Sequence, residues 1–498
     1  QQQMPQPVMT QVKTIVYLML ENRSLDNLLG WLYRGTKPGY IYPSGSSPNY
    51  DGIPIGASQP LNGLSNPIVP RPDNLGSYAG YVPYWDPTEA MYSDFDWRGV
   101  LNQMFGASSE ITGMPATNTP VGMRGFFQDY YEADIPQGYD WKDILWTFTP
   151  QQLPIINRLA ELYGVSDAWH CSVPTQTNPN RAYSLIGTSQ GRNNNSWDAV
   201  ETYKGKTFMN VLAEQGNKTW GMYYFDIWKD SKCFTEYTFP ALQKAGGDIG
   251  TMDRFYTLAK SNGLPNFVYL EPKWGYSVAG KITQGNDYHP PTNVYPGEQF
   301  LLDVFSHLYK CPQWNEMLFI ITFDEHGGTY DHHPPTWNAI NPDNKNGDYG
   351  FGFNLFGVRV PTLLISPFVK PGTVFRAPAG SNYPFYDHTS FINTFLRWAG
   401  IDVNSTAFNL GKRMPQAPHF DDVLFATHVN DSQLDAQVPE YDTSRDLRPI
   451  FEGVGFASVR RIMHDYETVE EMKAAADEYR ADPAAFEARL GQPREPKA

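Results

Sequence analysis

The sequence predicts an α/β fold in which helices sandwich a mostly parallel sheet. Short, uniformly apolar runs rich in β-branched residues have the character of strands that are covered on both faces. Segments with helical periodicity alternate with these runs over most of the chain, which is typical of a parallel sheet with helices on both sides. At 498 residues, the chain is long enough to bury the large core that such a fold requires.

The elements follow from local patterns. The strand candidates, in chain order, are Lys13–Leu20, Phe267–Leu270, Leu318–Phe323 and Pro361–Ile365. The first helix candidate is Leu153–Tyr163, in which Leu153, Ile156 and Leu159 share one face and Gly164 provides a C-terminal stop. Amphipathic patterns predict further helices, which start within Ala182–Gly187 and cover Gln299–Tyr309 and Ser390–Ala399.

We expect a single catalytic domain over residues 1–435. Within it, residues 31–140 are rich in Pro, Gly, Asn and Tyr and have weak periodicity, which predicts a long loop insertion that covers the site. Residues 436–498 are expected to form a peripheral tail with short helices over Thr468–Tyr479 and Pro483–Leu490.

Charge and composition exclude some classes of function. A net charge of -15 argues against nucleic-acid binding and against simple electrostatic adhesion to anionic membranes, but it leaves a small anionic substrate open. No apolar stretch approaches the roughly 20 residues that span a bilayer. Three cysteines are too few for a disulfide scaffold. The chain begins with Gln rather than Met, so we expect a processed or trimmed start and a secreted or periplasmic protein.

Two short acidic segments, far apart in the sequence, each follow a predicted strand. Glu21-Asn22 follows the first strand, and Asp324-Glu325 follows the strand that ends at Phe323. In open α/β sheets, ligands bind at the carboxyl ends of the strands, so two strands that deliver carboxylates there predict a metal site and hydrolysis. Oxygen ligands suit Mg²⁺, Ca²⁺ or Mn²⁺, whereas added imidazole would admit Zn²⁺ or Fe, so the identity of the metal stays open.

Adjacent acids after an apolar run could also be a solvated strand end. The residues that follow, His326-Gly327-Gly328, favour a site instead, because two glycines let the backbone turn closely under a ligand. His332 and His333 follow within reach.

A third segment, Thr177-Asn178-Pro179-Asn180-Arg181, has two interpretations. Asn and Pro dominate turns, so it could be a simple turn. Alternatively, Thr177 is a nucleophile at a helix N-terminus, where backbone N–H groups attract an oxyanion. A threonine hydroxyl needs a metal or a base to activate it, and a metal held by the acidic segments would do so. Arg181 could clamp a phosphate with two hydrogen bonds.

Together, the three segments resemble the signatures of the bacterial and plant phosphoesterase family. This family holds the non-specific and phosphatidylcholine-type phospholipases C and an acid phosphatase of the same fold. The resemblance covers about Lys13 to Gly400 and includes Tyr330-Asp331-His332 in the last segment. It implies an alkaline-phosphatase-like sheet and a covalent phosphoenzyme on Thr177.

The resemblance also points to histidines. It implies that His289, in Asn286-Asp287-Tyr288-His289-Pro290, contacts the phosphate or protonates the leaving group, although a loop histidine beside Pro290 is the alternative. His388 also matches a family position, and its alternative is a helix-start residue. The chain departs from many members at Leu25 and Asn27, where Phe and His are common, which removes one imidazole.

The sequence therefore predicts a hydrolase with one divalent metal ion. The expected metal ligands are Glu21, Asn22, Thr177, Asp324 and Glu325, and the expected catalytic residues are Thr177, Asn180, Arg181, His289, His332 and His388. Asn180 and Arg181 are expected to orient the phosphate.

The expected substrate is a phosphate ester. Aromatic loops between Trp31 and Trp141 could form a rim that makes transient contact with a lipid surface, as in a phospholipase C, or narrow a pocket for small phosphomonoesters, as in an acid phosphatase. A non-catalytic binding module on the same fold is a third alternative. A sulfatase is rejected because Cys171-Ser172-Val173-Pro174-Thr175 has its Pro one place late and lacks the Arg. A serine hydrolase is rejected because no Gly-x-Ser-x-Gly elbow follows a strand.

Overall fold

The computed structural model of the chain describes residues 5–72, 93–106, 114–132, 141–195, 202–244, 246–275, 285–290, 293–440, 448–455 and 469–490, with the single positions 458, 462 and 466. Nine of the described strands form one sheet with the spatial order β2-β13-β7-β12-β11-β1-β10-β8-β9. Adjacent strands are parallel except at β12, which runs antiparallel to β11 and β7. The predicted α/β class with a mostly parallel sheet is confirmed.

The predicted strands are the centre of this sheet. Its members are β1 (Thr14–Leu20), β2 (Tyr40–Tyr42), β7 (Gly164–Ser166), β8 (Trp220–Tyr224), β9 (Asp248–Thr251), β10 (Phe267–Leu270), β11 (Met317–Phe323), β12 (Thr362–Ile365) and β13 (Thr373–Phe375). All seven residues of β1 and all seven of β11 are buried, as uniformly apolar strands covered on both faces should be.

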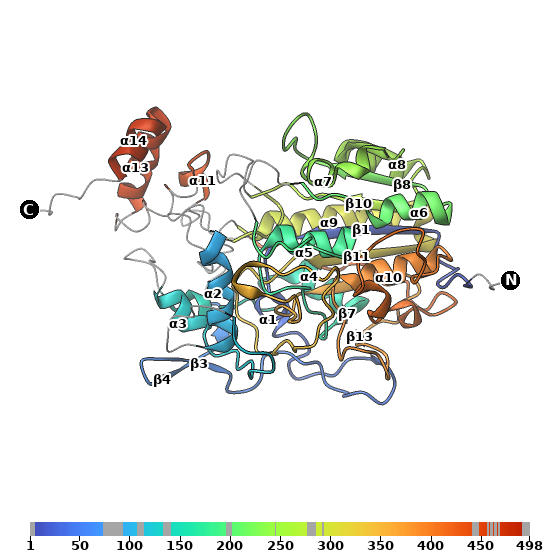
Figure 1. Ribbon diagram of the computed structural model, residues 1–498, viewed down its shortest axis with the longest axis horizontal. Coiled ribbons are helices and arrows are strands. Elements are labelled where there is room, and N and C mark those ends of the chain that lie inside the picture. Colours follow the sequence, from blue (N-terminus) through green and yellow to red (C-terminus); the bar gives the residue numbers. More distant parts are fainter. Residues whose placement is uncertain are drawn as a thin grey trace, which may run out of the picture.

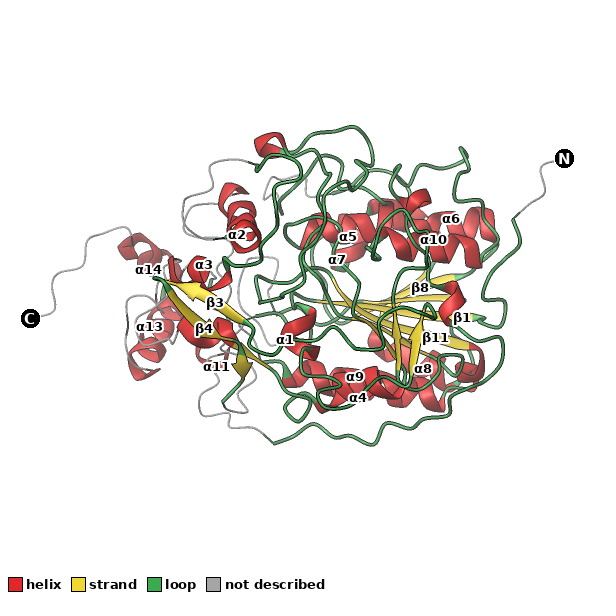
Figure 2. Ribbon diagram, turned by 90° about the horizontal axis from the view of Figure 1, so that it is seen from below, coloured by secondary structure: helices red, strands yellow, loops and turns green. Residues whose placement is uncertain are grey.

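Helices cover both faces of the sheet (Figure 1, Figure 2). In Figure 2, α5 (Thr177–Ile186), α6 (Phe208–Gly216) and α10 (Thr389–Trp398) lie above the sheet. On the opposite face lie α4 (Pro154–Leu162), α8 (Met252–Lys260) and α9 (Tyr295–Lys310). The helices predicted at α4, α9 and α10 are confirmed. Two short helices, α1 (Leu25–Leu29) and α7 (Phe234–Thr238), complete the central part of the fold.

Helix α5 begins earlier than the sequence predicted. The apolar pattern predicted a start within Ala182–Gly187, but the first residue is Thr177, as in the alternative interpretation that placed Thr177 at a helix N-terminus. The Asn-Pro pair suggested a turn, yet a proline in the first turn of a helix costs no internal hydrogen bond because N–H groups there have no intrahelical partner. This earlier start puts Thr177 at the helix N-terminus. Gly187 ends the helix in a left-handed conformation with φ 75°.

The region 31–140 contains more regular structure than the predicted loops. Strand β2 joins the edge of the main sheet through β13. The other described elements are the hairpin β3 (Ser58–Leu61) and β4 (Leu64–Pro67), β5 (Val69–Pro70), which pairs with β6 (Trp146–Thr147), and the helices α2 (Ser93–Phe105) and α3 (Phe126–Glu132). They pack around a separate apolar cluster that weak local periodicity did not reveal. Positions 73–92, 107–113 and 133–140 lie outside the described residues.

The tail helices are α11 (Arg448–Phe451), α13 (Val469–Ala481) and α14 (Pro483–Leu490), which lie away from the sheet (Figure 1). The helix predicted over Pro483–Leu490 is confirmed, and the one predicted from Thr468 is confirmed from Val469 onward. Cys171, Cys233 and Cys311 are free and buried. Among the described helices, none has both the length and the apolar character to cross a bilayer.

Candidate active site

The register of two central strands brings the acidic segments together. Strands β1 and β11 are parallel neighbours, and their last residues, Leu20 and Phe323, are paired. The next residues, Glu21 and Asp324, therefore emerge side by side at the carboxyl edge of the sheet. Carboxylate oxygens of Glu21, Asp324 and Glu325 lie within 4.8 Å of one another, and all three side chains are buried. The predicted meeting of the two segments is observed.

Backbone N–H groups fix the orientation of these carboxylates. Asp324 Oδ1 accepts hydrogen bonds from the backbone N–H groups of Asn22, at 3.1 Å, and Glu325, at 2.7 Å. Glu325 Oε2 accepts from the N–H of Gly327 at 2.6 Å. Gly327 has φ 62°, and a Cβ atom there would lie 2.2 Å from the carbonyl oxygen of Asn22. The position therefore requires glycine both for its conformation and for its closeness to the first acidic segment.

Thr177 faces this group of oxygens from the N-terminus of α5. Its Oγ1 lies 3.1 Å from Glu21 Oε2 and 3.5 Å from Asn22 Oδ1. The carboxylates around it are buried, whereas Thr177 itself is only partly buried. The hydroxyl therefore faces the acidic group from a residue that is itself partly exposed.

Arg181, one turn further along α5, lies behind the carboxylates. Its Nη2 and Nε atoms lie 2.9 Å and 3.2 Å from Glu21 Oε1, and Nη2 also donates to the carbonyl of Met19. Its guanidinium lies over the ring of Trp274, 4.9 Å from the centroid. Because one edge of the guanidinium is taken by Glu21, the phosphate clamp with two hydrogen bonds that the sequence suggested would have to use the Nη1 side.

The donor set fits a divalent metal ion. Three buried carboxylates face a single guanidinium, that of Arg181, and Asp324 Oδ2 has no hydrogen-bond partner within the described part of the chain. Burial and the neighbouring carboxylate of Asp324 raise the pKa of Glu21 well above its usual range, as expected where negative charge is not compensated. Carboxylate, amide and hydroxyl oxygens are ligands that hard divalent cations prefer.

His289 bonds to Asn22 instead of facing an open space. Its Nε2 lies 2.9 Å from Asn22 Nδ2, and its Nδ1 contacts the carbonyl of Pro290. Burial lowers the pKa of His289 to about 3, so the imidazole is neutral at pH 7. A neutral ring that donates from Nδ1 to Pro290 accepts from the Asn22 amide, which turns Asn22 Oδ1 toward Thr177. His289 therefore orients the side chain of Asn22, one of the metal ligands expected from the sequence.

His388 and Asn180 also hold parts of the site in place. His388 Nε2 lies 2.7 Å from the carbonyl oxygen of Asp324, and its Nδ1 accepts a hydrogen bond from Trp169. Asn180 Oδ1 accepts from the N–H groups of Ser172 and Val173, and its Nδ2 donates to carbonyls of the same loop. These hydrogen bonds use both ends of the Asn180 amide, so Asn180 supports the loop before Thr177 instead of offering the phosphate contact expected from the sequence.

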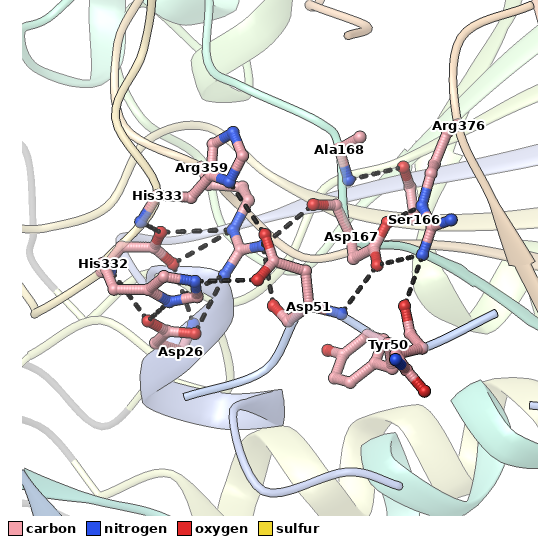
Figure 3. Close-up of polar contacts among 12 residues, drawn as sticks. Asp26, Tyr50, Asp51, Ser166, Asp167, Ala168, His332, His333, Arg359 and Arg376 are labelled. Carbon is pink, nitrogen blue, oxygen red and sulfur yellow. Dashed lines mark hydrogen bonds and ion pairs between the residues drawn. The ribbon is translucent and has the colours of Figure 1, made fainter. Parts of the chain in front are cut away.

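His332 lies in a different group of polar side chains (Figure 3). It bonds to Asp26 and Asp51, and Arg359 lies beside them. Reasoning from the sequence did not find Asp51 or Arg359, since the first lies in a Gly- and Pro-rich loop and the second precedes a strand without any motif. Trp274, which contacts Arg181, and Trp169, which contacts His388, were also missed because neither is part of a motif.

Several known proteins are similar to this chain. The model of the Phosphoesterase family matches residues 12–400. Non-specific phospholipase C1 of Arabidopsis thaliana is 33% identical over 400 residues, which cover 78% of this chain and 67% of that protein. Non-specific phospholipase C3 of the same plant is 31% identical and covers 85% of this chain and 80% of that protein.

More distant similarities were also found. Phospholipase C A of Mycobacterium tuberculosis is 25% identical over 86% of this chain and 81% of that protein. Among solved structures, a protein in the alkaline phosphatase superfamily from Vibrio parahaemolyticus aligns with a TM-score of 0.31 and 15% identity, over 54% of this chain and 63% of that chain. The family match covers most of the chain, including all three acidic and threonine segments. The chain belongs to the phosphoesterase family.

Proposed function

We propose that the chain hydrolyses phosphate esters in two steps through a phosphothreonine on Thr177, and that its substrates are glycerophospholipids. The observation that carries the chemical part is the position of Thr177 Oγ1, 3.1 Å from Glu21 Oε2 at the N-terminus of α5. A nucleophilic hydroxyl beside a proton acceptor and a cluster of hard ligands is the arrangement that phosphoryl transfer to a side chain needs.

In the first step, Thr177 Oγ1 attacks phosphorus while its proton passes to Glu21 Oε2, the acceptor of its hydrogen bond. The bond between phosphorus and the ester oxygen breaks, and the alcohol leaves with a proton from water. With a glycerophospholipid, diacylglycerol is the leaving alcohol and the headgroup stays on the phosphorus bound to Thr177. In the second step, the hydroxide left by that water attacks phosphorus, the phosphorylated headgroup leaves, and Glu21 returns the proton to Thr177 Oγ1. Thr177 lies at the N-terminus of α5, and the partial positive charge of a helix N-terminus favours a bound phosphate.

Glu21, Asn22, Thr177, Asp324 and Glu325 would hold the divalent ion, which supplies charge stabilisation at the phosphate and lowers the proton affinity of the threonine hydroxyl. Arg181 keeps Glu21 in position, and His289 and His388 fix the orientation of Asn22 and Asp324. We therefore regard Asn180, His289 and His388 as positioning residues.

Two observations support a lipid substrate. The relatives that cover most of this chain are named phospholipases C. In addition, large apolar side chains are exposed around the β3–β4 hairpin, where Ile55 is 95% exposed and Leu64 is 68% exposed. Exposed apolar loops favour contact with a lipid surface over a narrow polar pocket.

A substrate panel with metal analysis of the same sample tests the proposal. We expect release of diacylglycerol and a phosphorylated headgroup from phosphatidylcholine vesicles, and weaker release of phosphate from a small phosphomonoester. Phosphate release from the monoester alone would instead identify an acid phosphatase. Absence of bound metal and of turnover with every ester would identify a non-catalytic binding module.

A further inference from the structure

A second group of metal-ligating side chains lies on the segments that follow the catalytic ligands. We call it the histidine cluster, and its members are Asp26, Asp51, His332, His333 and Arg359 (Figure 3). Ligand atoms of Asp51, His332 and His333 lie within 4.8 Å of one another. Asp26 follows the first acidic segment in the chain and His332 follows the second, so both segments lead from the proposed active site to this cluster.

Hydrogen bonds already orient two imidazoles toward one carboxylate. His332 Nε2 lies 2.9 Å from Asp51 Oδ1, and His333 Nδ1 lies 2.8 Å from Asp51 Oδ2. The other nitrogen of His332, Nδ1, lies 2.6 Å from Asp26 Oδ2, and Asp26 is fully buried. A histidine that binds a metal commonly donates its second ring N–H to a carboxylate, and Asp26 occupies that position for His332.

Hydrogen bonds to the end of β7 hold the backbone of Asp51 in place. Its backbone N–H donates to Asp167 Oδ2 at 2.8 Å. Asp167 in turn receives two hydrogen bonds from Arg376, each 2.8 Å long. The loop that carries Asp51 is thereby held against the end of β7, so the three donors are in place before any ion arrives.

The charge of the cluster favours a cation. Arg359 lies 2.9 Å from Asp26, 3.2 Å from Asp331 and 3.3 Å from Asp51. Without metal, three carboxylates against Arg359 and a His332 ring that donates from both nitrogens leave one formal negative charge. A divalent ion that displaces the Nε2 proton of His332 would bring the total to neutral. The side chains of Asp51 and His333 are 42% and 39% exposed, so an ion can enter from solvent.

His170 provides an independent observation beside the cluster. Its ring centroid lies 5.5 Å from that of His333. Its Nδ1 lies 2.8 Å from the carbonyl oxygen of Gly357, so Nδ1 carries the proton. Nε2 is then a bare acceptor, fully buried and without a hydrogen-bond partner among the residues the structure describes. A buried imidazole lone pair with nothing to accept is costly unless a cation or water sits near it.

We propose that Asp51, His332 and His333 bind a divalent transition-metal ion, best matched by zinc, at a site separate from the catalytic metal. Two imidazoles and one carboxylate, with water in the remaining position, form a common zinc ligand set. Imidazole ligands select zinc over magnesium or calcium, which prefer oxygen. The bound ion would link the loop at Asp51 to the loop after β11.

Zinc stoichiometry of the full-length protein tests the site. The protein is stripped with a chelator, reloaded with zinc, desalted, and its zinc content measured by mass spectrometry. We expect His333→Ala to retain one zinc ion per chain fewer than the wild type. As a matched control, His428→Ala removes an exposed histidine elsewhere and should retain the wild-type zinc content. The double variant Asp324→Asn/His333→Ala should lose zinc from both sites, which separates this site from the catalytic one.

Cobalt provides a second readout. Cobalt bound by two imidazoles and a carboxylate in tetrahedral geometry absorbs visible light, and we expect this band in Asp324→Asn but not in Asp324→Asn/His333→Ala. Should His333→Ala fail to fold by circular dichroism, Asp51→Asn, which keeps the side-chain size, replaces it. Equal zinc content in the wild type and in the folded cluster variants would overturn the proposal.

Discussion

Thr177 Oγ1 lies 3.1 Å from Glu21 Oε2, although 156 positions separate the two residues in the chain. Two features of the fold produce this contact. Glu21 leaves the sheet at the end of β1, and Thr177 begins the helix that packs above the same edge. Thr177 is therefore placed by the first turn of a helix and Glu21 by the end of a strand, and such fixed placement favours the proposed phosphoryl transfer.

The close approach of Gly327 to the first acidic segment leads to the first prediction. Gly327→Ala should destabilise the protein and weaken metal binding, because a Cβ there would lie 2.2 Å from the Asn22 carbonyl oxygen. The matched control is Gly380→Ala, with φ 81° and nothing within 4 Å, which should cost only about 1–2 kcal/mol for the left-handed conformation. Denaturant unfolding and metal titration of both variants provide the measurement. Equal destabilisation would show that the close approach has no consequence.

The positioning role of His388 predicts a loss of metal affinity. His388→Ala removes the hydrogen bond to the Asp324 carbonyl. Loss of a residue that hydrogen-bonds to a metal ligand typically lowers metal affinity or activity by about 10–100-fold. His388→Gln, which can present an amide N–H to the same carbonyl, should restore part of it. Metal titration by calorimetry compares the three proteins. If His388 merely fills space, both variants will bind metal as the wild type does.

Arg181 forms ion pairs with the buried carboxylates, so the stability lost when it is replaced should depend on whether metal is bound. Arg181→Met leaves Glu21 and Asp324 without their ion pair, and breaking a buried pair costs about 3–5 kcal/mol. We expect the full loss in chelator-treated protein and a smaller one with saturating metal, because the metal replaces part of the missing charge. Thermal unfolding with and without chelator measures both. An identical loss in the two conditions would argue against a metal at these carboxylates.

The stability that His332 contributes in the metal-free protein should depend on pH. Burial alone would lower the pKa of His332, but its hydrogen bonds to Asp26 and Asp51 outweigh burial and raise the pKa to about 10. Since the folded pKa lies above the usual 6.5, the stabilisation is complete below about pH 6.5 and is lost as the pH rises toward 10. In chelator-treated protein, the stability difference between wild type and His332→Gln should shrink over this range. A difference that is constant with pH would contradict the charged state of His332.

Much of the site could be predicted from the sequence because its ligands directly follow strands. Glu21 and Asp324 come after uniformly apolar runs, and the rule that ligands bind at strand ends brings them together. What the sequence could not provide is the set of supporting contacts. Asn180 looks like a phosphate ligand in the motif, but its amide hydrogen bonds are made with the loop before Thr177. Asp51 comes from the insertion with weak periodicity and His332 from the segment after β11, and no local pattern predicts a contact between residues 281 positions apart.

The state of Thr177 during turnover tests the central claim most directly. Wild-type protein is mixed with substrate, quenched in acid within milliseconds, digested and examined by mass spectrometry. With phosphatidylcholine as the substrate, we predict a peptide that carries phosphocholine on Thr177, a weaker signal and slower turnover in Thr177→Ser, and neither adduct nor turnover in a folded Thr177→Ala protein. Turnover by Thr177→Ala close to that of the wild type, or the adduct on a different residue, would contradict the account.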